Sequence, residues 1–313
     1  MAGSDDRPVL TLGHSPDADD MVMWWPLVGM KDPEGRPVDG PEGTPAIVSD
    51  RFSFQTIPDD VQRLNRRAIE RGDLDITAIS AHAYPYLKDR YRITRSGASM
   101  GEGYGPKLVV QRDIPAETPE ALFESRTPVV AVPGVHTTAY LTLRLLLGRD
   151  FEVREMLFSE IPGAVAEGEV DAGLLIHEAQ IAFEQLGLRR LMDLGESWSI
   201  AHKLPLPLGL NVLKRDLDDR YGSGSVDEVA ELLGRSVRHA REHSGASKRF
   251  LLLHSEARPE WRDEALVDRY LAMYVSGLTL DMGEPGRSAL ELLLGEGFRA
   301  GLSPDPGHID LAG

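Results

Sequence analysis

The chain has 313 residues, of which 42% are hydrophobic and 27% charged, and its formal net charge at pH 7 is −16. This length favours two lobes over a single core, and no apolar run approaches the roughly 20 residues that span a bilayer. The acidic balance argues against nucleic acid as a partner, and the lack of cysteine excludes disulfides, thiolate catalysis and cysteine-bound metals. The first residues are acidic where a secretory signal is basic, so we expect a cytoplasmic protein with no membrane insertion.

The first part of the chain alternates predicted strands and helices. An apolar run at residues 9–13 predicts a buried strand, and residues 31–49, rich in proline, glycine and charge, predict an exposed loop or hairpin. Apolar residues at helical spacing predict a helix within residues 59–72, which a glycine ends. A second apolar run then predicts a strand at residues 74–80.

The same pattern recurs further along. Residues 128–132 predict a strand, 137–147 a helix, 161–168 another helix and 170–176 a buried strand. Alternation of this kind is typical of parallel sheets flanked by helices, so we expect an α/β fold.

The final third of the sequence is different in character. Apolar spacing predicts amphipathic helices at residues 226–240 and 267–274, and helices dominate after about residue 215. The glycine-rich residues 101–105 precede a predicted strand at 107–110 rather than a helix, which is not the arrangement of a nucleotide-binding loop.

One histidine stands where ligand sites of α/β sheets usually lie. His177 directly follows the predicted strand at residues 170–176, at the carboxyl end of the sheet. Neutral imidazole accepts protons near cellular pH, so a general base is one interpretation. A structural histidine at a strand end is the other.

The turn at residues 133–139 joins a predicted strand to a predicted helix. The amides of Thr138 and Ala139 should be unpaired in the first helical turn, which would suit a carboxylate. Alternatively, Thr137 or Thr138 only caps the helix. Ser80, at the end of its own strand, would either contact the same ligand or cap the helix that follows.

Three carboxylates crowd the end of the first predicted strand, in the segment SPDADD. Together with Ser15, they form a possible wall of a cleft. Hard cations prefer several oxygen ligands, but such a cluster at a helix start is more often a cap with favourable dipole placement. We therefore expect no metal at Asp17, Asp19 and Asp20.

Six motifs, in this order, resemble one known family. They are HSPDADD, LDITAISAHAYPYLKDRY, RSGASMGEGYGPKLVV, VPGVHTTAYL, GEVDAGLLIHE and LPLPLGLNVLKRDL. Together they resemble the menaquinone-biosynthesis family that contains 1,4-dihydroxy-6-naphthoate synthase and chorismate dehydratase, with the synthases nearer. The resemblance extends from Leu10 to about Leu302, and residues 31–49 look like an insertion.

The resemblance implies a two-lobed α/β architecture, the type II periplasmic-binding-protein fold, with a cleft between lobes and a helical C-terminal region. Residues 1–110 and 207–313 would form lobe I, and residues 111–206 lobe II. The histidine of the family's IHE motif, here His177, is the proton acceptor. The family's ligand contacts correspond to Ala78, Ile79, Ser80, Thr138 and Ala139.

The resemblance also implies a reaction and a substrate. The family's synthases convert cyclic dehypoxanthine futalosine to 1,4-dihydroxy-6-naphthoate without a cofactor. We therefore expect a cofactor-free carbon–carbon lyase that acts on a small carboxylate by proton abstraction. A chorismate dehydratase-like enzyme and a non-catalytic binding protein for small carboxylates are the alternatives.

Near the expected cleft, the chain departs from the family pattern. Asp17 and Asp19 stand where synthases usually have cysteine and asparagine, and Ala78 stands where they often have lysine. Ala179 and Gln180 follow the IHE motif, where an arginine commonly lies nearby. These differences predict a more acidic cleft.

Overall fold

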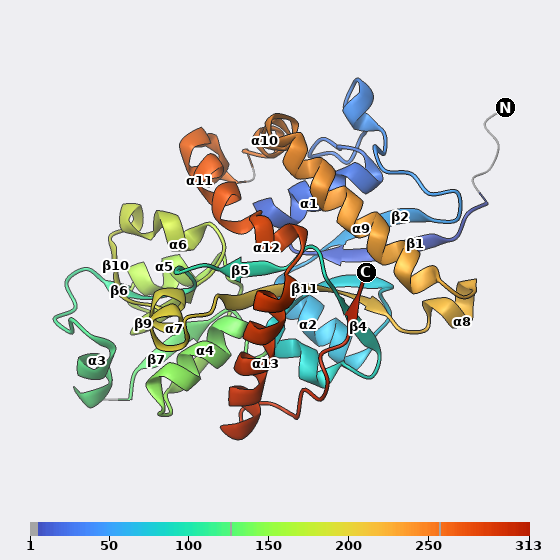
Figure 1. Cartoon of the computed structure of the whole chain (residues 1–313). Coiled ribbons are helices and arrows are strands. Elements are labelled where there is room, and N and C mark those ends of the chain that lie inside the picture. Colours follow the sequence, from blue (N-terminus) through green and yellow to red (C-terminus); the bar gives the residue numbers. More distant parts are fainter. Residues whose placement is uncertain (1–5, 126, 257) are drawn as a thin grey trace.

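Two β-sheets form the frame of the molecule, and helices pack around both (Figure 1). The computed structural model describes residues 6–125, 127–256 and 258–313. The first sheet has the strand order β12-β4-β11-β3-β1-β2, and β5 pairs with β11 outside this path. Its strands are β1 (Val9–His14), β2 (Ser53–Pro58), β3 (Ile76–Ser80), β4 (Tyr91–Thr94), β5 (Ser99–Gly101), β11 (Leu206–Lys214) and β12 (Leu311–Ala312).

The second sheet has the order β10-β6-β9-β7-β8. Here β8 and β9 run parallel to β7, whereas β6 is antiparallel to β9 and β10. Its strands are β6 (Lys107–Gln111), β7 (Val129–Val132), β8 (Glu152–Glu155), β9 (Ala172–Leu175) and β10 (Leu188–Asp193). The expected lobe boundary at residue 110 thus falls inside a strand of the second sheet, and the division into lobes stays a prediction.

The helices fall into three groups along the chain. Before β6 they are α1 (Ala18–Val28), η1 (Pro41–Gly43), α2 (Val61–Glu70) and η2 (Ala81–Tyr86). Between β6 and β11 they are α3 (Pro119–Ser125), α4 (Thr138–Leu147), α5 (Ile161–Ala166), α6 (Ala179–Ala182), η3 (Phe183–Leu186) and α7 (Leu194–His202). After β11 they are α8 (Leu217–Tyr221), α9 (Ser225–Glu242), α10 (Ser244–Leu253), η4 (Pro259–Arg262), α11 (Glu264–Tyr274), α12 (Gly277–Leu280) and α13 (Gly283–Arg299). In the described part of the chain, no helix is both long and apolar enough to cross a membrane.

The strand β3 and the helix α2 before it form for local reasons. Each residue of β3 is buried, as a strand between β1 and β11 requires. Asp60 caps α2, because its carboxylate accepts hydrogen bonds from the amides of Gln62 and Arg63. Gly72 then takes a left-handed φ of 58°, which ends the helical segment before β3.

The turn between β7 and α4 depends on a glycine. Gly134 has a φ of 152°, and a Cβ at this position would lie 2.2 Å from Cδ of Gln62 on α2. Because L side chains rarely adopt this φ, and a Cβ would also displace the Gln62 side chain, glycine is favoured in this turn beside α2. Thr137 then caps α4, since its Oγ1 accepts a hydrogen bond from the Tyr140 amide at 3.3 Å.

The last third of the chain returns to the first sheet. Helix α9 packs on α1 and buries an apolar face that includes Val229, Leu233 and Val237. Strand β12 pairs parallel to β4, and α13 packs on β11. Residues 31–49 form a largely exposed loop with a single bridge between Lys31 and Pro37.

Candidate active site between the two sheets

A cavity lies between the two sheets. Its wall combines the ends of β1 and β3, part of β11, the start of α4, the residues after β9, and one face of α11. Every site residue expected from the sequence lines it: Ser15, Asp17, Asp19, Asp20, Ala78, Ile79, Ser80, Thr138, Ala139 and His177. The fold thus brings these residues from four separate segments of the sequence to one place.

Ser80 ends β3, and Asn65 of α2 holds it in place. The Oδ1 atom of Asn65 accepts a hydrogen bond from the Ser80 amide at 2.8 Å, and Nδ2 donates to Ser80 Oγ at 3.0 Å. The Ser80 hydroxyl keeps its own hydrogen for a ligand. It makes no side-chain cap to η2, so the capping alternative is wrong. Asn65 is fully buried and was not identified from the sequence.

Thr138 and Ala139 are the first two residues of α4. A helix provides no backbone acceptor for amides in its first turn, and its N-terminus carries partial positive charge. The Thr138 hydroxyl is already engaged, because it donates to the Leu208 carbonyl at 2.8 Å and accepts from the His82 amide at 3.2 Å. The backbone amides, rather than this hydroxyl, are therefore left for an anion.

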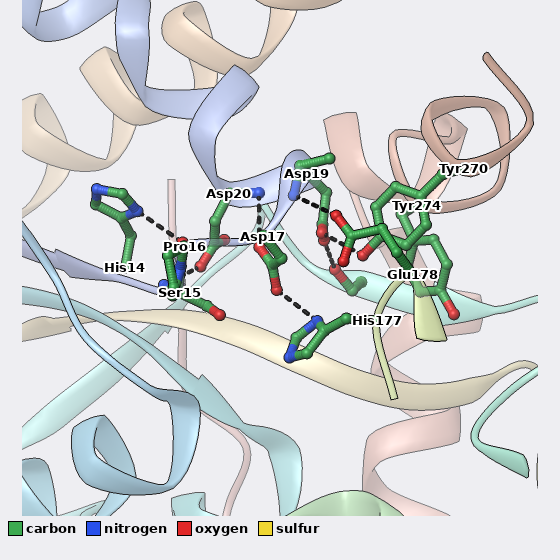
Figure 2. Close-up of polar contacts among 12 residues, drawn as sticks. His14, Ser15, Pro16, Asp17, Asp19, Asp20, His177, Glu178, Tyr270 and Tyr274 are labelled. Carbon is green, nitrogen blue, oxygen red and sulfur yellow. Dashed lines mark hydrogen bonds and ion pairs between the residues drawn. The ribbon is translucent and has the colours of Figure 1, made fainter. Parts of the chain in front are cut away.

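His177 extends from the end of β9 toward the first sheet, where it meets Asp17 (Figure 2). Its φ of 52° lies in the left-handed region, which is uncommon for a residue other than glycine. Nδ1 lies 2.5 Å from Oδ2 of Asp17. Nε2 is buried and has no hydrogen-bond partner among the described residues. One ring nitrogen is thus anchored, and the other is left for a ligand.

The ion pair sets the charges of its two members. Burial on its own would lower the pKa of His177, but the Asp17 carboxylate outweighs burial and raises this pKa to about 9. Burial opposes ionisation of Asp17 too, yet the imidazolium lowers the pKa of that carboxyl to about 2. At neutral pH the pair is therefore an imidazolium and a carboxylate.

Other carboxyls lie around this pair (Figure 2). Burial, followed by the charge of Asp17, raises the pKa of Asp19 to about 8. Burial and the charges of Asp17 and Asp19 raise the pKa of Asp20 well above its ordinary value. Burial and the charge of Asp17 also raise the pKa of Glu178. The predicted excess of acids is present, but burial keeps Asp19 mainly protonated near neutral pH.

The fold brings a histidine to the acidic cluster, which the sequence did not indicate. One ligand atom from each of Asp17, Asp19 and His177 lies within 4.8 Å of the others. However, the 2.5 Å between His177 Nδ1 and Asp17 Oδ2 is shorter than the roughly 3.3 Å between two ligands of one tetrahedral zinc ion. Both Asp19 oxygens also accept hydrogen bonds, from Tyr270 and from Ser99. In this arrangement the residues do not fit a metal centre.

Sequence reasoning missed the tyrosines that close the cavity. Tyr270 and Tyr274 of α11 stack with ring centroids 4.4 Å apart, and both line the cavity. The Tyr270 hydroxyl donates to Asp19 Oδ1 at 2.7 Å, and the Tyr274 hydroxyl contacts the Gln180 amide. Helical spacing indicated only that these tyrosines face a core, because their partners lie far away in the sequence.

Glu178 is the last residue of the IHE motif, and the sequence indicated no role for it. Its Oε1 accepts hydrogen bonds from the Ala18 amide at 3.0 Å and from Trp261 Nε1 at 2.9 Å. It therefore joins the segment after β9 to the start of α1 and to η4.

Comparison with known proteins identifies relatives over most of the chain. Residues 10–299 match the family described as menaquinone biosynthesis. A 1,4-dihydroxy-6-naphthoate synthase from Thermus thermophilus is 37% identical over 298 residues, which cover 95% of this chain and 97% of that protein. A synthase of the same name from Streptomyces coelicolor is 36% identical over 248 residues, which cover 78% of this chain and 82% of that protein.

Solved structures share the fold. A crystal structure of a protein from Archaeoglobus fulgidus is 35% identical, with a TM-score of 0.74 over 96% of this chain and 99% of that chain. An alkanesulfonate-binding protein from Xanthomonas axonopodis pv. citri, bound to MOPS, is 16% identical with a TM-score of 0.63, covering 96% of each chain. The expected periplasmic-binding-protein fold is therefore confirmed. On its sequence, its fold and its match to residues 10–299, the chain belongs to the menaquinone-biosynthesis family.

Proposed function

We propose that this chain is a carbon–carbon lyase that converts cyclic dehypoxanthine futalosine to 1,4-dihydroxy-6-naphthoate. Its synthase relatives support this assignment. The observation that carries it is the imidazole of His177, which is anchored through Nδ1 while Nε2 has no partner among the described residues. An imidazole held in this way in a cavity wall is suited to receive a proton from a substrate carbon.

The substrate carboxylate would bind at the opposite part of the cavity wall. The Ser80 hydroxyl and the amides of Thr138 and Ala139 are donors without a competing acceptor of their own helix or strand. Binding there would fix the substrate relative to His177 and so hold its acidic carbon in position for proton transfer. Apolar side chains such as Ile79 and Leu210 line the same cavity and reduce access of water.

Catalysis then starts with proton transfer to Nε2 of His177. Loss of that proton would provide the electron pair for the carbon–carbon cleavage, and the aromatic naphthalene product would draw the reaction forward. Only neutral imidazole accepts a proton, and the pKa of His177 is raised to about 9. We therefore expect kcat/KM to rise with pH and to level off above about pH 9.

The assignment is tested by incubating purified protein with cyclic dehypoxanthine futalosine and, in parallel, with chorismate. We expect 1,4-dihydroxy-6-naphthoate from the first and no dehydration of the second, measured by mass spectrometry. His177→Ala should lower turnover by about 10²–10⁴-fold while substrate binding persists. His243→Ala, which does not line the cavity, is the matched control. Product from chorismate, or binding of both compounds without turnover, would favour the alternatives and contradict the proposal.

We also place this reaction in the cytoplasm, as expected for a biosynthetic enzyme. The family description and the names of the relatives support this location. Cell fractionation with an antibody to the native protein tests it, and recovery in the periplasm would contradict it.

A further inference from the structure

The imidazole of His177 is fixed by contacts from both sheets. Asp17 and His177 come from the segments after β1 and β9, and their side chains are only 4% and 16% exposed. On another side of the ring, Phe158 packs edge-on with ring centroids 4.6 Å apart. Among the described residues, His177 and Lys203 are the non-glycine residues with positive φ. A backbone held in this region implies that surrounding contacts determine where the side chain points.

We propose that Asp17 is the positioning residue of His177, holding the imidazole through Nδ1 so that Nε2 faces the bound substrate. This inference rests on the proposed function, in which Nε2 receives the proton. Asp17 is itself fixed, because its Oδ1 accepts a hydrogen bond from the Asp20 amide at 3.3 Å and so caps α1. The carboxylate thus joins a helix start to an imidazole and leaves the ring little freedom to rotate.

The nearby carboxyls do not compete for this position. Asp19 accepts hydrogen bonds from Tyr270 and Ser99, and Asp20 accepts one from the Ser15 amide at 2.7 Å. Glu178 is bound to the Ala18 amide and to Trp261. Of these four acids, Asp17 is the one whose oxygen contacts the imidazole.

The electrostatic surroundings agree with this arrangement. Asp17, Asp19 and Asp20 face His177 from the start of α1, Asp60 faces it from the start of α2, and Glu178 is its neighbour in the chain. Arg258 lies over the Phe158 ring at 5.7 Å. The Asp17 carboxylate makes the largest contribution that raises the pKa of His177, and His177 in turn lowers the pKa of Asp17 to about 2.

The test replaces Asp17 with asparagine, which keeps the shape and an oxygen acceptor but removes the charge. In the ligand-free protein, NMR titration of the His177 ring should show a midpoint lower by at least about two pH units in Asp17→Asn. Asp19→Asn is the matched control, because it removes a neighbouring carboxyl that does not contact the ring, and it should move the midpoint by less. In the neutral wild-type ring, the proton should reside on Nδ1.

Kinetics then separate positioning from a structural role. In Asp17→Asn the acidic limb of kcat/KM against pH should move to lower pH by the same amount, while the plateau value falls at least about tenfold, since the ring is a weaker base and less well oriented. If Asp17 only stabilised the structure, its substitution would lower kcat/KM by the same factor at every pH. If Asp17→Asn does not fold, Asp17→Ser keeps a helix cap but cannot reach the ring, and the same shifts are expected.

The outcomes distinguish the two proposals. If wild-type protein makes no naphthoate product, the proposed function fails, whereas the NMR titration still tests the pairing. If product forms but neither the midpoint nor the acidic limb moves in the Asp17 variants, the positioning role is overturned. A neutral wild-type ring with its proton on Nε2 overturns it as well.

Discussion

Asp19 offers a direct measure of how strongly the cavity disfavours buried charge. Its carboxyl is 5% exposed, and its pKa is raised to about 8 by burial and by the charge of Asp17. Asparagine has nearly the same shape, so Asp19→Asn can accept from Tyr270 through Oδ1 and donate to Ser99 through Nδ2. The substitution therefore removes the ionisation while keeping both contacts.

The sign of the expected effect follows from proton binding. Between the unfolded pKa of 3.8 and the folded value of about 8, the folded protein holds a proton that the unfolded chain has lost. The free energy of unfolding of the wild type thus falls as pH rises through this window, and Asp19→Asn lacks this contribution. Between about pH 5.5 and pH 8.5, the variant should gain about 3 kcal/mol relative to the wild type.

Urea denaturation at the two pH values measures this difference. Comparing variant and wild type at each pH cancels the titration of groups that lie away from Asp19. Asp89→Asn, at a side chain that is 93% exposed, is the control for removing an aspartate without altering the cavity. A stability difference between Asp19→Asn and wild type that stays constant or shrinks as pH rises would refute a protonated Asp19.

Three further results are expected. A small dicarboxylic acid soaked into crystals should lie within about 3 Å of the Thr138 and Ala139 amides, and binding only on the outer surface would count against that site. EDTA should leave turnover unchanged, because the acidic cluster does not fit a metal; a loss that a divalent ion restores would contradict this. Gly195→Ala should cost about 3 kcal/mol in unfolding free energy, since its Cβ would lie 1.9 Å from the Tyr104 carbonyl oxygen. Gly163→Ala, with nothing within 4 Å, is the control, and equal denaturation midpoints would disprove the clash.

Local patterns predicted the elements that carry the site. The apolar run at residues 74–80 and the helical spacing before it correspond to β3 and α2, and the turn at 133–139 leads into α4 as expected. These predictions succeed because burial of a central strand and capping of a helix depend on neighbouring residues. The strand ends predicted His177 and Ser80 as site residues, whereas the cleft between two lobes was implied by the family resemblance.

Contacts between distant segments could not be predicted in this way. Asp17 and His177 are 160 positions apart, so neither spacing nor composition indicated that they pair. Helix α13 was also not identified, although helices were expected after residue 215. It contains several glycines, which weaken local helical propensity, yet a Cβ at Gly297 would lie 2.8 Å from Ser303 Oγ. Close packing selects glycine there, and only the folded chain reveals it.

The buried acids also determine how the cavity receives an anionic molecule. Counted from the sequence, three aspartates at positions 17–20 would repel a carboxylate. In the folded protein, His177 balances the charge of Asp17, and a pKa of about 8 keeps Asp19 mainly neutral at pH 7. A carboxylate entering the ligand-free cavity thus meets almost no net charge from Asp17, His177 and Asp19.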